Sequence, residues 1–562
     1  MSSSAAGISV RTVLAAVAAC LAECDSGVQQ AASPPLAAPP PPKPAAVDAT
    51  RLVGAGHLPT DPRAHESTPL IVDGKLYVTG TWSRVFAFDA ASGASLWSYD
   101  PKVPGHTAVN GCCDVVNRGV AVWNGKVYVG TLDGRLVALD ATTGIPVWDV
   151  RTTEPGSRYT MTGAPRVIKG KVLIGNGGAE MGVRGYVPGD PAKPFESPAL
   201  EMAAKTWKGQ WWKYGGGGTV WDSMAYDPKL DLLYIDLNID GHARQVIMQA
   251  PKNAFFYVID RANGQFISAT GRPIETPQAR YGETGNPWNS VPGPGGTHNW
   301  QPMAFSPLTV LVYIPVSALS FPYFPDQHFS LKKLGWNTGA DFNAGSLPQD
   351  DKIKAAAIAA SQGHLAAWDP VAQKEAWRIP QGHPWNGGVL ATAGNLVFEG
   401  TSRGEFNAYQ ADTGAPLRSV QLHTGILAPP VTYQVGNDQY IAVVRGWGGA
   451  AGLAAGEIAL ASHTSESNVP RLMVFKLNGT DVIPTPPKPP ERVLQPPPAS
   501  ASAAMVANGK TFFNHNCGVC HGDCATSGGV LPDLRYSVAL ADNDDLAKQK
   551  TAGKPHKVSV TQ

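Results

Sequence analysis

The sequence lacks an excess of charge of either sign. Its 562 residues include 45 Lys and Arg against 44 Asp and Glu, so the formal net charge is 45 − 44 = +1. This balance gives no electrostatic reason to expect a nucleic acid or an acidic surface as a partner. The sequence also lacks an apolar run long enough to cross a bilayer as a helix.

Glycine, proline and tryptophan are abundant instead. The chain contains 61 Gly, 49 Pro and 15 Trp. Many glycines in turns, together with regularly placed tryptophans, are more typical of an all-β repeat protein than of a helical one.

One pattern recurs along the chain: an apolar strand ends in Ala-x-Asp or a close variant, a turn follows, and the next strand often carries Trp. The first two copies end at Asp89 and Asp140, which are 140 − 89 = 51 residues apart, a blade-sized period. Asp and Gly favour tight hairpin turns, and Trp covers a large apolar area. Four-stranded sheets that cannot bury their own faces stack around an axis, so the pattern predicts a β-propeller. Later copies end at Asp260, Asp369 and Gln410.

Residues 1–45 read as an export signal followed by a spacer. Arg11 precedes the apolar run 12–19, and small residues come before Cys20. The run Val-Ala-Ala-Cys resembles a lipoprotein box, which would put a lipid on Cys20; an ordinary cleavable signal or a disordered N-terminus is the alternative. Residues 33–45 are Pro-rich and predict a stiff, extended spacer.

Two adjacent cysteines, Cys112 and Cys113, form the most distinctive stretch of the sequence. An exported chain tends to oxidise its cysteines, and a disulfide between neighbours closes a small ring of the strained, functional kind. Two buried structural cysteines are the alternative. Arg118 follows five residues after Cys113 and carries a fork of donors suited to a carboxylate or a quinone oxygen.

The stretch Cys-Cys-Asp-Val-Val-Asn-Arg-Gly resembles the vicinal-disulfide segment of quinoprotein alcohol dehydrogenases. The resemblance implies an all-β, eight-bladed propeller that holds pyrroloquinoline quinone (PQQ) and calcium over residues 46–483. It implies that the Cys112–Cys113 ring packs on one face of the quinone and that Trp221 stacks on the other. It also implies quinone contacts from Glu66, Arg118, Thr162, Gly177, Gly178, Lys252, Asn299, Trp300, Trp385 and Asn386, and a calcium ligand in Glu180.

The sequence departs from the family pattern in two places. The chain passes from Ile235 directly to Asp236, where the family has a whole blade with a calcium-binding Asn and the catalytic Asp. Asp236 and Asp240 are the candidates that this stretch offers for a base, which must reach the substrate hydroxyl. The N-terminal strand that completes the ring also looks absent between Val47 and Glu66. We therefore expect a propeller that is one blade short.

The C-terminal part carries a second cofactor motif. Residues 484–500 are a Pro-rich linker, and residues 501–562 resemble a truncated cytochrome c domain of small helices. Its Cys517-x-x-Cys520-His521 run is the attachment motif for c-type haem, with His521 as an iron ligand; a redox cysteine pair is the alternative. No Met follows Met505, so we expect the sixth ligand to be missing or substituted.

These features predict a periplasmic quinohaemoprotein dehydrogenase, in one reading anchored as a lipoprotein. It would oxidise alcohols with PQQ and pass electrons through haem c to a cytochrome or a quinone pool. Two alternatives remain at this point. The chain is an electron-transfer protein that binds quinone and haem without catalysis, because the base is missing, or it is a propeller scaffold.

The haem motif gives a direct prediction. We expect one covalent haem, bound through Cys517 and Cys520, whose colour survives boiling and appears on a haem-stained denaturing gel. The double substitution Cys517→Ala, Cys520→Ala serves as the control and should remove the colour. A colourless unmutated chain, or colour that persists in the double variant, contradicts the prediction.

Overall fold

The computed structural model describes residues 51–58, 63–183, 219, 221, 235–239, 241–261, 264–269, 287–332, 335–348, 350–491, 493–494 and 502–536. The predicted signal with Cys20, the Pro-rich spacer and Asp240 lie outside the described residues. Residues 49–562 form one compact unit, to which all described residues belong. No helix among these residues has the length and apolarity that a membrane crossing requires.

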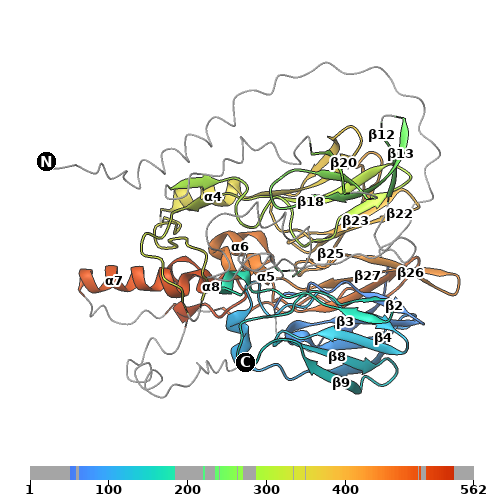
Figure 1. Ribbon diagram of the computed structural model, residues 1–562, viewed down its shortest axis with the longest axis horizontal. Helices are drawn as coiled ribbons and strands as arrows, with labels where there is room; N and C mark the ends of the chain where they lie inside the picture. Colours follow the sequence, from blue (N-terminus) through green and yellow to red (C-terminus); the bar gives the residue numbers. More distant parts are fainter. Residues whose placement is uncertain are drawn as a thin grey trace, which may run out of the picture. The chain divides into compact units, whose positions relative to one another are not determined.

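The described strands form six four-stranded antiparallel sheets and two two-stranded ones (Figure 1). The first two sheets contain β2 (Leu70–Val72), β3 (Lys75–Thr79), β4 (Val85–Asp89), β5 (Ser95–Tyr99), and then β6 (Ala121–Trp123), β7 (Lys126–Gly130), β8 (Arg135–Asp140), β9 (Pro146–Arg151). The next sheets contain the pair β10 (Arg166–Ile168) and β11 (Lys171–Leu173), and then β12 (Ile235–Ile239), β13 (His242–Gln249), β14 (Tyr257–Asp260), β15 (Phe266–Ser268).

The later sheets follow the same sequential order, except for the last. They contain β17 (Ala304–Ser306), β18 (Leu311–Ala318), β20 (Gln362–Asp369), β21 (Lys374–Pro380), and then β22 (Val389–Thr392), β23 (Leu396–Gly400), β24 (Glu405–Gln410), β25 (Pro416–Gln421). The last sheet has the order β1 (Arg51–His57), β28 (Arg471–Lys476), β27 (Asp438–Arg445), β26 (Val431–Val435), and a separate pair joins β16 (Trp288–Ser290) to β19 (Phe321–Tyr323).

The helices are short. They are α4 (Asp351–Ala360), α5 (Gly449–Ala454), α6 (Gly456–Ser462), α7 (Ala503–Phe513) and α8 (Val519–His521), with the single turns η2 (Thr81–Ser83), η3 (Gly105–Asn110), η4 (Ala179–Met181), η5 (Asn514–Gly518), η6 (Asp523–Ala525) and η7 (Leu534–Tyr536). All five copies of the sequence pattern end a strand of a four-stranded sheet, namely β4, β8, β14, β20 and β24. The β-propeller prediction is therefore confirmed.

The hairpin turns and the core both follow from the sequence pattern. Asp73 and Gly74 join β2 to β3 with positive φ values of 50° and 73°, the backbone that a two-residue hairpin turn requires. Between neighbouring sheets, Val85 and Ala87 of β4 pack against Val129 and Val137 in one buried apolar cluster. Burial between the faces of successive sheets is what stacks them as blades.

The Trp of one sheet fastens it to the next. Trp97 Nε1 donates to the Ala141 carbonyl at 3.2 Å, and the Tyr77 hydroxyl donates to the same oxygen at 3.2 Å. In the same way, Trp377 Nε1 donates to the Ala411 carbonyl at 3.1 Å.

The Asp at the end of such a strand has a local role. Its carboxylate accepts from the turn, as Asp89 does from Ser92 N at 2.8 Å, and these hydrogen bonds lower the pKa of Asp89.

The expectation that the ring-completing strand is absent before Glu66 is wrong. Residues Arg51–His57 form β1, which pairs antiparallel with β28 from Arg51 opposite Lys476 to His57 opposite Arg471. The sequence does not predict this strand, because β1 contains two glycines and an irregular register between Leu52 and Gly54, and its local strand signal is therefore weak. Its partner is the last strand of the propeller.

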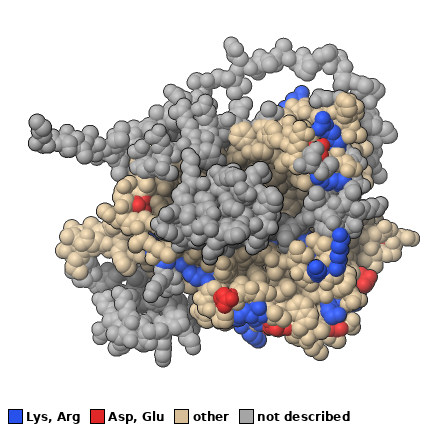
Figure 2. All heavy atoms as spheres, viewed as in Figure 1, with Lys and Arg blue, Asp and Glu red and all other residues tan. Residues whose placement is uncertain are grey.

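The C-terminal described residues are helical, as expected for the haem-motif segment. The start of the Pro-rich linker contacts the propeller: Arg445, which is fully buried, donates to the Pro484 carbonyl at 3.1 Å, and Ser467 N donates to the Pro487 carbonyl at 3.2 Å. On the face seen in Figure 2, Lys and Arg side chains lie interspersed with Asp and Glu side chains among the described residues.

Packing of Trp97 gives a prediction about stability. A Cβ on Gly144, which has a φ of +73°, would lie 2.6 Å from the Trp97 ring, whereas a Cβ on Gly93, with a φ of +71°, would meet nothing within 4 Å. Gly144→Ala should lower the free energy of unfolding by about 2–4 kcal/mol, since overpacking adds to the backbone strain, and Gly93→Ala by about 1–2 kcal/mol. Denaturant unfolding of both variants checks this; equal losses would contradict it.

Candidate functional site

Residues from separate sheets meet at the candidate site because each precedes the first strand of its sheet. Glu66, Arg118 and Thr162 lie three or four residues before β2, β6 and β10, and Trp300 and Trp385 lie four residues before β17 and β22. All five residues are buried. Equivalent positions in stacked sheets converge on one region, which is why residues far apart in the sequence come together here.

Arg118 is the centre of this arrangement. Its Nη2 lies 2.7 Å from Glu66 Oε2, and its Nη1 donates to Thr162 Oγ1 at 2.8 Å. The guanidinium carbon lies 5.1 Å from the centre of the Trp221 ring and 5.0 Å from that of Trp300. A planar cation close to two indole rings and paired with a buried carboxylate is suited to bind a flat anionic ligand.

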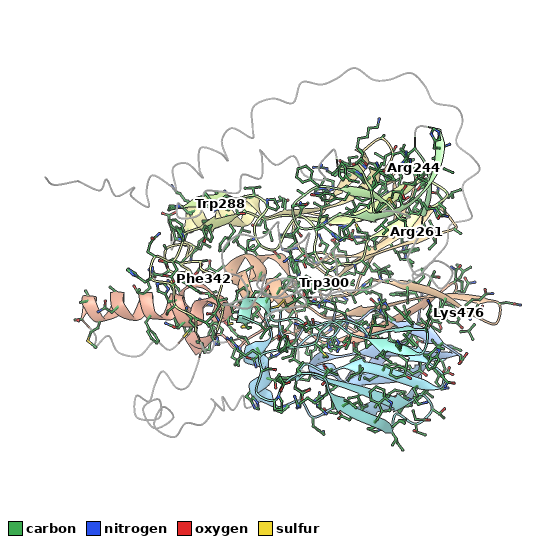
Figure 3. All side chains as sticks on the ribbon, in the orientation of Figure 1. Arg244, Arg261, Trp288, Trp300, Phe342 and Lys476 are labelled. Atoms are coloured by element: carbon green, nitrogen blue, oxygen red, sulfur yellow. A yellow bond between two sulfur atoms is a disulfide. The ribbon has the colours of Figure 1, made fainter. Side chains whose placement is uncertain are left out.

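Three buried indoles extend the site. Trp300, Trp385 and Trp447 share one apolar cluster, against which Trp221 packs. Figure 3 shows Trp300 in the interior, whereas Arg244 and Lys476 lie at the outer edges of their sheets. Within the described part of the chain, the N–H groups of these three indoles have no hydrogen-bond partner. Buried donors of this kind fit a ligand that carries several acceptor oxygens, as PQQ does.

Lys252 also lies near Trp221, with its ammonium 5.7 Å from the ring centre. The residue as a whole is exposed, yet partial burial of the ammonium lowers the pKa of Lys252, and the charge of Glu180 opposes that shift. The backbone is held tightly: Thr297 N donates to the Lys252 carbonyl at 3.1 Å, and a Cβ on Gly296 would lie 2.5 Å from Lys252 Cβ.

The Gly177–Glu180 loop lies beside Trp221. A Cβ on Gly177 would be 3.5 Å from Trp221 Cβ, and Gly178 adopts a left-handed conformation with a φ of 106°. Glu180 starts from this turn, and its carbonyl accepts from Asn337 N at 2.7 Å. Calcium takes six to eight oxygen ligands, and the described residues contain no group of three or more Asp, Glu, His or Cys side chains placed to hold a metal ion. The role of Glu180 as one ligand of calcium stays a prediction.

Cys112 and Cys113 are joined to each other by a disulfide. Both are half-buried, and the following residue, Asp114, is buried and lies 3.1 Å from Arg63 Nη1. The disulfide therefore belongs to the same chain segment as Arg118, and ion pairing fixes the start of that segment.

The two asparagines that we predicted to line the pocket both make hydrogen bonds to other parts of the chain. Asn299 Nδ2 donates to the Gly295 carbonyl at 2.7 Å. The Asn386 amide donates to Gln381 Oε1 at 2.6 Å and accepts from Ser402 N at 2.9 Å. Each asparagine adjoins a site tryptophan, so its hydrogen bonds position that indole.

Neither candidate base is brought into the site by a described contact. Asp236 lies in β12, where its backbone pairs with Gln245, and Asp240 lies outside the described residues. Asn238, on the same strand, is exposed.

The haem motif lies on a continuous helical run, α7–η5–α8. Cys517 and Cys520 are free thiols three residues apart, the spacing that puts two side chains on one face of a helix, and His521 follows at once. Burial raises the pKa of Cys517, and it raises the pKa of Cys520 to about 11. Two neutral thiols and an adjacent imidazole fit covalent attachment of haem c.

Two residues near the site were missed from sequence. Trp447 follows β27 in a Gly-rich run, and that context was the signal available. Glu399 on β23 is fully buried, accepts a hydrogen bond from Gln381 Nε2, and so joins the network that positions Asn386. Burial raises its pKa well above the ordinary value of 4.5, so Glu399 is neutral in the folded protein over a range in which the unfolded chain is ionised.

Glu399 predicts a pH dependence of stability. Because its pKa is higher in the folded state, the folded protein holds a proton that the unfolded chain releases, and stability is lost as pH rises from about 4.5 through the folded pKa. Glu399→Gln should abolish this loss and be more stable than the unmutated protein at pH 7 by more than about 1 kcal/mol, since one pKa unit corresponds to about 1.4 kcal/mol. Urea unfolding at pH 4.5 and pH 7 measures the difference. Exposed Glu405→Gln is the control; parallel behaviour of the two variants would refute the assignment.

Comparisons with known proteins agree with this geometry. Residues 53–238 and 272–441 match the PQQ family described as glucose/ethanol/alcohol dehydrogenase, beta-propeller domain. Quinohemoprotein alcohol dehydrogenase ADH IIB of Pseudomonas putida is 44% identical over 569 residues, which cover 84% of this chain and 81% of that protein.

Two solved structures share the fold. That of quinohemoprotein alcohol dehydrogenase ADH IIG of Pseudomonas putida has a TM-score of 0.79 at 38% identity, with 86% of this chain and 84% of that chain covered. The enzyme of Comamonas testosteroni has a TM-score of 0.75 at 37% identity and the same coverage. With a site built for a flat anionic ligand on a matching propeller, this chain belongs to the family of PQQ-dependent alcohol dehydrogenases.

Proposed function

We propose that this protein is a quinohaemoprotein that oxidises alcohols with PQQ and passes the electrons to a covalently bound haem c. The observation that carries the proposal is the Arg118 cluster, in which one buried guanidinium contacts Glu66 and Thr162 and lies close to the rings of Trp221 and Trp300. Bound PQQ would supply an acceptor for the hydrogen of the alcohol.

The chain's own residues have separable roles in this proposal. Arg118 and Thr162 bind carboxylates of the quinone, since a fork of cationic donors and a hydroxyl suit that group. Trp221 and the Cys112–Cys113 disulfide would cover the two faces of the quinone. Lys252, whose ammonium lies 5.7 Å from the centre of the Trp221 ring, would donate to a quinone oxygen and stabilise negative charge there.

Glu180 would supply one carboxylate ligand to calcium, oxygens of the quinone would supply others, and bound calcium would polarise the quinone. For haem, Cys517 and Cys520 would form the two thioethers, and His521 would ligate the iron. Electrons would leave the haem for a soluble cytochrome or a quinone pool. We place the propeller in residues 46–483, the linker in 484–500 and the cytochrome-like part in 501–562. The export signal supports a periplasmic location, with Cys20 as the point of lipid attachment.

A second function is favoured by one observation. The chain runs directly from Ile235 to Asp236 at the point where family members carry the segment with the catalytic Asp. Without a base that accepts the hydroxyl proton, the protein would bind quinone and haem and transfer electrons without efficient catalysis.

Reconstitution distinguishes the two functions. The purified protein is loaded with PQQ and calcium, and dye reduction is followed with simple primary alcohols. Loss of a general base costs about 10²–10⁴-fold, so we expect turnover far below the ordinary enzyme rate of roughly 10 per second. Binding of PQQ, measured by quenching of tryptophan fluorescence, should still be present and should be lost in Arg118→Met but not in the exposed control Arg151→Ala. Ordinary turnover would instead identify a base, which Asp236→Asn and Asp240→Asn would locate. Absence of PQQ binding would overturn both functions.

A further inference from the structure

Arg158 lies between β9 and β10 and contacts three segments that are far apart in the sequence. Its Nε donates to Asn110 Oδ1 at 3.4 Å, and its Nη1 and Nη2 donate to the carbonyls of Lys332 and Gly335 at 3.2 and 2.9 Å. Nη2 also lies 3.2 Å from Met181 Sδ. The residue is half-buried, and burial lowers its pKa from an ordinary value of 12.5.

Two of these contacts reach chain segments that carry residues predicted to bind the quinone or calcium. Asn110 ends η3 and stands two residues before Cys112 of the disulfide. Met181 directly follows Glu180 in η4. The backbone of Arg158 supports the same loop, because a Cβ on Gly178 would lie 2.9 Å from the Arg158 carbonyl oxygen.

The contact with Lys332 leads to the haem-motif segment. Lys332 presents its carbonyl to Arg158, and its ammonium donates to the His515 carbonyl at 3.2 Å. His515 stands two residues before Cys517, and its Nε2 lies 3.4 Å from Asp341 Oδ1.

Two further hydrogen bonds join the same segments. Asn514 donates to Asn343 at 3.2 Å, and Leu347 N donates to Asp523 Oδ2 at 2.8 Å. The stretch that contains Lys332, Asp341, Asn343 and Leu347 therefore docks the haem-motif segment, and Arg158 holds this stretch at Lys332 and Gly335.

We propose that Arg158 is a positioning residue that couples the two cofactor regions. Through one guanidinium it fixes the disulfide segment, the Gly177–Met181 loop and the loop that docks the haem-motif segment. This inference rests on the proposed function for its cofactors. Only a planar fork of five donors can serve these directions at once, whereas a lysine ammonium offers one compact charge.

The first test measures quinone affinity. Removal of a residue that orients ligand-binding groups commonly costs about 10- to 100-fold, so Arg158→Ala should weaken PQQ binding by that factor, read from tryptophan quenching of the full-length protein. Arg158→Lys should not rescue binding. Ethylguanidinium added to Arg158→Ala should restore part of the affinity, whereas methylammonium should not. Arg151→Ala, whose exposed arginine bonds only the Asp133 carbonyl among the described residues, is the matched control.

The second test requires no quinone. Hydrogen exchange of the full chain should rise in Arg158→Ala within residues 105–113, 177–183 and 502–536 together. Lys332→Met removes the contact to His515 alone, and it should raise exchange in 502–536 while residues 105–113 stay as in the unmutated protein.

The outcomes separate this proposal from the proposed function. Failure of the unmutated protein to bind PQQ contradicts the function, and the exchange pattern then decides the coupling by itself. A folded Arg158→Ala variant with a PQQ dissociation constant within twofold of the unmutated protein, or with raised exchange in only one of the two regions, overturns the coupling. If Arg158→Ala does not fold, PQQ affinity and hydrogen exchange are measured in Arg158→Lys. Affinity and exchange equal to those of the unmutated protein would then overturn the coupling.

Discussion

The buried ion pair between Arg118 and Glu66 is the interaction on which the candidate site depends. Glu66 is 1% exposed and Arg118 5%, so both charges have lost their hydration. Removing one partner of such a pair commonly costs about 3–5 kcal/mol, because the remaining charge stays buried. Thr162 and the rings of Trp221 and Trp300 complete the surroundings of the guanidinium. A ligand with carboxylates would add counter-charge to a group that is already desolvated, and this favours tight binding.

The propeller supplies the geometry that makes this pair possible. Two pairs of neighbouring blades are fastened by an indole, Trp97 to Ala141 and Trp377 to Ala411, and the loops before the first strands are thereby held at repeated positions. Glu66 and Arg118 come from consecutive blades, so the pair also bridges them. Packing at the outer turns stabilises the blades. Stable blades in turn hold the site residues within hydrogen-bond distance of one another.

Sequence reasoning succeeded where the signal is local. The turn that follows Asp89 is stabilised by hydrogen bonds between residues close in sequence, so the sequence predicts its position in a blade. It failed at β1, whose stability comes from pairing with β28 at the other end of the propeller. The orientation of Asn386, whose amide serves Gln381 and Ser402, and the burial of Glu399 are likewise tertiary facts. The resemblance named Arg118 as a quinone-binding residue, and the structure surrounds it with Glu66 and Thr162. The resemblance could not reveal Arg158, because no motif marks a residue that acts by joining loops.

The pairing of β1 with β28 has a consequence for synthesis of the chain. Ribosomes make proteins from the N-terminus, so β1 must wait without its partner strand until the chain has been made as far as Lys476. An unpaired strand edge is a template for wrong association. Five other four-stranded sheets can form in the meantime, since their strands are neighbours in sequence. Cys517 and Cys520 follow β28 in the sequence, so the last blade can close before the helical segment that carries them is complete. Assembly of the propeller can therefore precede folding of that segment.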